Sequence, residues 1–205
     1  LAAATYALAV PRGRALWLGA GVFGALACAT FGWMGHGGAT EGAGHMLHLA
    51  ADVLHALAAA LWIGALAAFA RLAAARNPGA ERLAALATAL DRFSPLGIAL
   101  VAVIAATGLV NGWYLIGTDV GAALHTAYGQ LLALKLALFA AMLALAARHR
   151  QRSVPALAAR LEANVLPQAD ALASLRRSLA AEALLGFAVL ALVAWFGTLA
   201  APGSM

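Results

Sequence analysis

The segment GHMLHLAADVLHALAAALWIGALAAF, residues 44–69, decides the fold of this chain. It is apolar enough, and long enough, to cross the hydrocarbon core of a bilayer, which takes about 18 residues or more. Its first half nevertheless carries His45, His48, Asp52 and His55. Because a polar side chain buried without a partner costs several kcal/mol, these four residues need a structural or functional reason.

The composition of the whole chain favours a membrane protein. Its 205 residues are 64% hydrophobic and only 10% charged, whereas soluble domains average about a quarter charged residues. The single cysteine, Cys28, excludes a disulfide or a paired-cysteine metal site within the chain. Standard nucleotide-binding, zinc-protease and serine-hydrolase motifs are absent from the sequence, and we expect the protein not to be an enzyme.

Five apolar segments predict an all-α, polytopic transmembrane helical bundle, with residues 1–205 in a single membrane domain. The predicted spans are residues 15–34, 46–70, 95–116, 129–147 and 179–200. The first ten residues are too short to span, and we interpret them as the tail of a truncated preceding helix. Ser94 and Pro95 predict the cap and first turn of the third span. Aromatic residues near the span ends predict an interfacial belt: Trp17, Trp33, Trp113, Tyr114 and Trp195.

The arginines predict the orientation of these spans. All of them lie before the first span, between the second and third, or between the fourth and fifth. The positive-inside rule makes that side cytoplasmic and places the histidine-bearing loops in the periplasm. The cytoplasmic loop, residues 148–177, contains segments that we expect to form short amphipathic helices. Topology and contact with membrane lipid headgroups explain the net charge of +5, so we expect no nucleic-acid partner.

The polar residues of the opening segment form a stripe on one face of the predicted helix. At 100° per residue, with His45 at zero, His48 falls at about −60°, Asp52 at about −20° and His55 at about −80°. The stripe descends about 15 Å, from the external interface almost to the midplane. We therefore expect it to face the bundle or a hydrated cavity, as a metal path or a proton relay. A set of mutually satisfied structural groups is the competing interpretation.

Other polar residues extend the candidate site. His36, at the external end of the first span, joins the four stripe residues as a candidate metal ligand. Supporting metal or gating roles are assigned to five residues: Met34, Asn111, His125, Lys135 and Glu182. Lys135 either extends to the external interface or pairs with Asp52, and Glu182 either complements a helix dipole or acts as a gate. For His36, His45 and His125 a solvated interfacial position is the alternative.

The ordered set of segments resembles the CopD/PcoD copper-resistance family of inner-membrane proteins. The likeness runs from about residue 35 to residue 202 and includes GHGG, HLAADVLHALAAALWIGAL, DRFSPLGIALVAVIAATGLVNGWYL, YGQLLALKLALFAAMLALAARHR and LRRSLAAEALLGFAVLALVAWFGTLA. The resemblance implies a multi-pass protein of the bacterial inner membrane that handles copper ions together with a periplasmic copper-binding protein. Family members usually have more spans than this chain, so we expect N-terminal helices to be missing.

These observations lead to a ranked set of functions. The first is copper-ion transport or homeostasis, in which His36 and His45 collect the ion and His48, Asp52 and His55 pass it inward. The second is a haem-binding electron-transfer or metalloreductase membrane subunit, which needs histidines from facing helices at matched depth. The third is a copper-binding membrane scaffold that does not transport.

Overall fold

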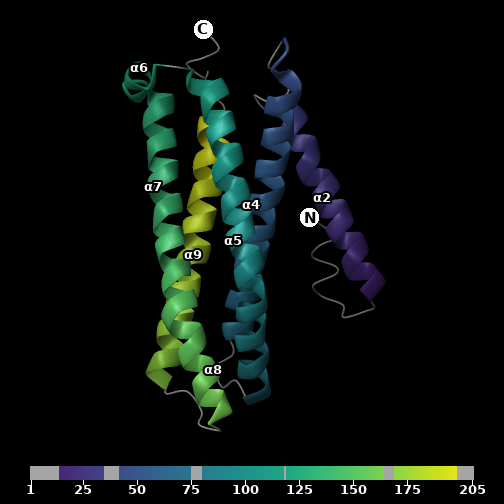
Figure 1. Ribbon diagram of the computed structural model, residues 1–205, viewed down its shortest axis with the longest axis vertical. Coiled ribbons are helices and arrows are strands. Elements are labelled where there is room, and N and C mark those ends of the chain that lie inside the picture. The colour runs from purple at the N-terminus through teal and green to yellow at the C-terminus, as the bar shows by residue number, and fades with distance from the viewer. Residues whose placement is uncertain (1–13, 35–41, 75–79, 118, 164–168, 198–205) are drawn as a thin grey trace. The chain divides into compact units, whose positions relative to one another are not determined.

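The computed structural model describes residues 14–34, 42–74, 80–117, 119–163 and 169–197, which are helical apart from short turns and contain no strand (Figure 1). Five helices in this part of the chain are long and apolar enough to cross a membrane. They are α2 (Arg14–Met34), α4 (His45–Ala73), α5 (Ala80–Ile116), α7 (Ala127–Arg148) and α9 (Ala169–Phe196). The prediction of an all-α, multi-pass membrane protein with five spans is confirmed.

Shorter helices lie in the connections. Helix α6 (Val120–Leu124) is capped by Asp119, whose carboxylate accepts a hydrogen bond from the Ala122 amide at 2.8 Å. One turn of π-helix, η1 (His149–Ser153), joins α7 to α8 (Val154–Glu162). A short helix within residues 148–177 is therefore confirmed. The second predicted segment of that loop is instead the beginning of α9, which starts at Ala169 rather than at residue 179.

The third span is longer than the sequence predicts. Ser94 and Pro95 were expected to begin it, but α5 starts at Ala80 and continues through Pro95, so the predicted cap is wrong. Pro95 has no N–H for the carbonyl of Asp91, an interruption that transmembrane helices tolerate when neighbouring groups compensate. At 1.5 Å per residue α5 measures roughly 56 Å, which exceeds the hydrocarbon thickness, so part of it must extend beyond the bilayer.

The chain divides into two compact units. The first unit comprises residues 1–60 and 102–115, and the second comprises residues 61–101 and 116–205. Helices α4 and α5 each contribute one segment to each unit. The polar stripe of α4 therefore belongs to the first unit, together with the last turns of α5.

In the first unit, α2 approaches α4 closely at Gly32. A Cβ added to Gly32 would lie 2.5 Å from Cγ2 of Val53 in α4, so a larger residue at this position would push the two helices apart. Such contacts through small residues are typical of transmembrane helix pairs. Most of the apolar side chains of α2 are exposed, among them Phe23 and Phe31, as expected for a surface that faces lipid.

In the second unit, apolar residues from α4, α5, α8 and α9 form a core: Phe69, Ala73, Leu86, Ala87, Leu90, Leu157, Leu175 and Leu179. Two arginine side chains cap the C-terminal end of α4. Arg82 donates to the carbonyls of Leu72 and Arg71 at 2.9 and 3.0 Å, and Arg176 donates to that of Ala73 at 2.6 Å. Cations at a helix C-terminus are favourable because they satisfy its last carbonyls. Helices α7 and α9 lie side by side (Figure 1).

The aromatic residues predicted to form an interfacial belt divide into two groups. Trp17, Trp33, Trp113 and Trp195 are 45% to 65% exposed, as residues directed toward lipid or its headgroups would be. Tyr114 is only half-exposed at most, and its ring lies against His48. Tyr114 therefore takes part in the polar site, and its place in the belt stays a prediction.

Candidate functional site

The stripe begins at a tight turn that precedes α4. Gly42 has a φ of +86°, a conformation that glycine adopts without the steric cost of a Cβ. Its carbonyl accepts a hydrogen bond from the His45 amide at 3.2 Å, so the turn leads directly into the first residue of the helix. His45 is half-buried at this end. The turn thereby positions the histidines over the first three turns of α4.

Three side-chain pairs join the stripe to α5. We call these pairs the ladder: His48 with Tyr114, Asp52 with Asn111, and His55 with Thr107. As the residue numbers rise along α4 they fall along α5, so the two helices run antiparallel through the ladder. All six residues lie in the first unit.

Each pair has a defined geometry. The rings of His48 and Tyr114 are stacked, with centroids 4.6 Å apart and planes inclined by 7°. The amide nitrogen Nδ2 of Asn111 donates to Oδ1 of Asp52 at 3.2 Å. Nδ1 of His55 and the hydroxyl of Thr107 are 3.0 Å apart.

The spacing on α5 explains how one helix reaches all three stripe residues. At 100° per residue, Thr107, Asn111 and Tyr114 fall within an arc of roughly 60°. They therefore form a second stripe, which matches in length the part of the first one from His48 to His55. Because the polar face of α4 contacts this stripe, it is directed toward a neighbouring helix, as transmembrane polar residues generally are.

Burial is deepest at two residues of the ladder. His48 is 2% exposed and Thr107 is 8% exposed, while the other four members are partly exposed. Oδ1 of Asn111 is buried and has no hydrogen-bond partner in the described part of the structure. A buried carbonyl oxygen in that state is costly unless a water or an ion completes it. Asn111 therefore offers an oxygen ligand next to the Asp52 carboxylate.

The ladder does not form a closed metal-binding site. Among the residues that the structure describes, no three His, Cys, Asp or Glu side chains lie close enough to hold one metal ion. The donors are instead distributed along α4 at intervals of three and four residues. Such an arrangement suits brief binding at successive positions better than permanent coordination.

The remaining predicted residues are distributed over the molecule. His36 lies outside the described residues, and Met34 is the last residue of α2. His125 is exposed and ends α6, and Lys135 is half-buried in α7; both belong to the second unit. The pairing of Lys135 with Asp52 stays a prediction.

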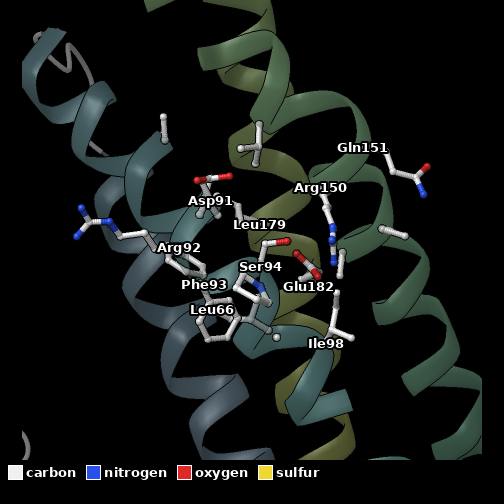
Figure 2. Close-up of a pocket in the computed structure, with 18 of the residues that line it drawn as sticks. Leu66, Asp91, Arg92, Phe93, Ser94, Ile98, Arg150, Gln151, Leu179 and Glu182 are labelled. Atoms are coloured by element: carbon white, nitrogen blue, oxygen red, sulfur yellow. The ribbon is translucent and has the colours of Figure 1, made fainter. Parts of the chain in front are cut away.

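Glu182 occupies a separate polar feature within the second unit. It is 1% exposed and lines a pocket of about 1490 Å³ that has mainly apolar walls. Figure 2 shows the side chains of Ser94 from α5 and Arg150 from η1 directed toward the same space as Glu182. Among the described side chains that line this pocket there is no His, Cys or Met. Its donors therefore suit copper poorly, and Glu182 is a candidate gating charge rather than a ligand.

Tyr114 and Thr107 are the site residues that sequence reasoning missed. Tyr114 was assigned to the aromatic belt, and Thr107 was not singled out. Thr107 lies four residues before Asn111, and Tyr114 lies three residues after it. The same intervals of four and three residues separate His48, Asp52 and His55 on α4. That repeated spacing is the signal that a search for matching polar faces on neighbouring helices would have detected.

Comparison with known proteins identifies relatives for most of the chain. The family model described as Copper resistance protein D matches residues 87–196. Copper resistance protein D of Pseudomonas syringae pv. tomato is 36% identical over 179 residues, which cover 87% of this chain and 57% of the relative. Copper transport protein CutJ of Bacillus subtilis (strain 168) is 34% identical over 151 residues, which cover 74% of this chain and 25% of that protein. The chain thus spans about half, or less, of these curated relatives, and no solved structure matches it.

Proposed function

This chain belongs to the copper resistance protein D family, and from that membership we propose that it carries copper ions across the bacterial inner membrane. The observation that supports transport most directly is the ladder. In the ladder, two imidazoles and a carboxylate follow one another along one face of α4, a helix long and apolar enough to span a membrane. Imidazole nitrogen is a good copper ligand. Polar side chains within a membrane span cost free energy, which favours a functional role for the stripe.

The ion enters from the periplasmic side in this proposal. His36 and His45 collect it, with Met34 nearby, and a periplasmic copper-binding protein delivers it. His48, Asp52 and His55 then bind it in turn, and Asn111 adds an oxygen ligand beside Asp52. The orientation follows from the arginines, which the positive-inside rule assigns to the cytoplasm.

Distributed binding sites favour passage over storage. An ion must bind strongly enough to enter a pathway and weakly enough to leave each position. Stations with few donors, already engaged with α5, keep copper affinity moderate because each must rearrange its contacts to take the ion. His125, Lys135 and Glu182, which belong to the second unit, have supporting or gating roles in this proposal.

The transport proposal is tested by replacing His48 and His55 together with Ala. We expect copper uptake into proteoliposomes, and copper bound by purified membranes, to fall roughly tenfold or more. Gln130→Ala removes an exposed polar side chain of α7 that has no role in this proposal, and it serves as the matched control with unchanged uptake. Circular dichroism and elution position establish that the double variant folds, since His48 is buried. Unchanged uptake by a folded double variant would refute the proposal.

The alternatives predict different measurements. A scaffold that binds copper without moving it gives binding but no uptake by the wild-type protein. A haem-binding subunit gives a Soret band in the purified protein. The ladder does not favour haem, because the side chains of α5 that face the histidines are Thr107, Asn111 and Tyr114. None of these three residues offers an imidazole as a second haem ligand.

A further inference from the structure

The hydroxyl of Thr107 is at the centre of a short hydrogen-bond chain. Its Oγ1 donates to the carbonyl of Val103 at 2.6 Å and lies 3.3 Å from that of Ile104. The same oxygen lies 3.0 Å from Nδ1 of His55. Thr107 is 8% exposed, so water has little access to compete for these bonds.

The number of protons decides which group donates. A threonine hydroxyl carries a single proton, and the short bond to Val103 uses it. The oxygen can then only accept from His55, which requires the imidazole proton to be on Nδ1. We infer that Thr107 fixes the tautomer of His55, so that Nε2 is the nitrogen that His55 presents to copper. This assignment rests on the proposed transport function for its consequence, though not for its geometry.

The packing around the imidazole supports a fixed orientation. Gly108 follows Thr107, and a Cβ placed on it would lie 3.4 Å from Cε1 of His55 and 3.8 Å from Nδ1. These are ordinary van der Waals distances, so the edge of the ring that carries Nδ1 packs against α5 at Gly108. A bond from a threonine hydroxyl to the carbonyl four residues earlier is an arrangement that threonine adopts within helices, so the contact with Val103 is local to α5.

The hydrogen bond to Thr107 affects copper binding through the basicity of the ligating nitrogen of His55 and through the orientation of its ring. Histidines that bind metals generally donate their other ring N–H to an acceptor, which orients the ring and makes the ligating nitrogen a better donor. Thr107 supplies that acceptor. It touches no cargo itself, and it is a positioning residue that acts through His55.

The test compares Thr107→Val with Thr107→Ser. Valine has nearly the shape of threonine but accepts no hydrogen bond, whereas serine keeps the hydroxyl. We expect Thr107→Val to abolish the nitrogen-15 NMR signature of an Nδ1-protonated His55 and to lower copper uptake by roughly 10- to 100-fold. Thr107→Ser should restore both. A His55→Gln variant identifies the His55 signal among the six histidines.

Thr30→Val is the matched control. Thr30 in α2 also donates to a carbonyl of its own helix, that of Ala27 at 2.7 Å, but it is not a member of the ladder. We expect this variant to leave both the His55 signal and copper uptake unchanged.

Three outcomes would overturn the inference. They are an Nε2-protonated His55 in the wild-type protein, an unchanged His55 signal in Thr107→Val, and a loss of uptake in Thr107→Val that Thr107→Ser does not restore. Failure of the transport proposal looks different. In that case Thr107 variants change the His55 tautomer as expected, while His55→Gln leaves copper uptake intact.

Discussion

At the residue scale, each ionisable side chain of α4 in the ladder contacts an uncharged side chain of α5. Asp52 is the only carboxylate of the ladder, and Asn111 donates a hydrogen bond to it. A neutral donor lowers the cost of placing a carboxylate at membrane depth without cancelling its charge, which a cation would do. In the proposed path, the Asn111 amide thus helps to hold the Asp52 carboxylate in the ladder.

Asn111 is expected to affect both stability and copper binding. Asn111→Leu keeps the size of the side chain and removes a hydrogen bond to a charged group, at a cost of about 1.5–3 kcal/mol. We expect a lower thermal midpoint and weaker copper binding. Asn111→Asp should be worse in the absence of copper, because it places a second carboxylate beside Asp52. Wild-type thermal stability in both variants would show that the contact has no energetic role.

The candidate site could be predicted only in part from the sequence. The angles of His48, Asp52 and His55 follow from helix geometry, which is local. Their partners lie 52 to 66 residues away on another helix, so no local pattern reveals them. The contact of Tyr114 with His48 was missed for that reason, since an aromatic residue near a span end has the same composition signal whether it faces lipid or a histidine.

At the element scale, hydropathy located every span but misplaced two of the helix ends. An apolar window detects only the part of a helix that lies in hydrocarbon. Helices α5 and α9 continue past it because Leu86, Leu90, Leu175 and Leu179 pack into a core of their own. Pro95 was interpreted as a helix start, whereas tertiary contacts carry α5 through it.

The end of α4 depends on arginine side chains. Arg176→Gln removes the donor to the Ala73 carbonyl, and we expect a loss of about 1–2 kcal/mol of stability, measured as a lower thermal midpoint in detergent. Arg177→Gln is the control. It removes the same charge from the next residue, which is exposed and whose Nε contacts a carbonyl of its own helix at 3.4 Å. Equal effects of the two variants would indicate that charge, and not capping, is responsible.

At the scale of the whole molecule, sidedness is the property that gives the proposed path its direction. In the sequence the arginines lie in alternate connections, and five of the six histidines lie in the other connections or in the first half of the second span; His149, between Arg148 and Arg150, is the exception. If the arginines are cytoplasmic, the ladder opens toward the periplasm, and the ion meets His45 before His55.

Cysteine labelling tests this orientation. In a Cys28→Ser background, Ala122→Cys in α6 and Ala159→Cys in α8 replace exposed alanines in connections that we place on opposite sides. We expect a membrane-impermeant thiol reagent applied at the periplasmic face to modify position 122, and to reach position 159 only after the membrane is permeabilised. The reverse pattern would invert the direction of the proposed path.

The ladder also fixes how many residues of α4 and of α5 separate its members, independently of its chemistry. His48 and His55 are seven residues apart, as are Thr107 and Tyr114, so equal spacing on the two helices keeps the three pairs in register. Inserting or deleting a single residue between Thr107 and Tyr114 would rotate everything beyond it by about 100° and separate the remaining pairs. Point substitutions within the ladder weaken one pair at a time, whereas a one-codon insertion or deletion would break the correspondence altogether.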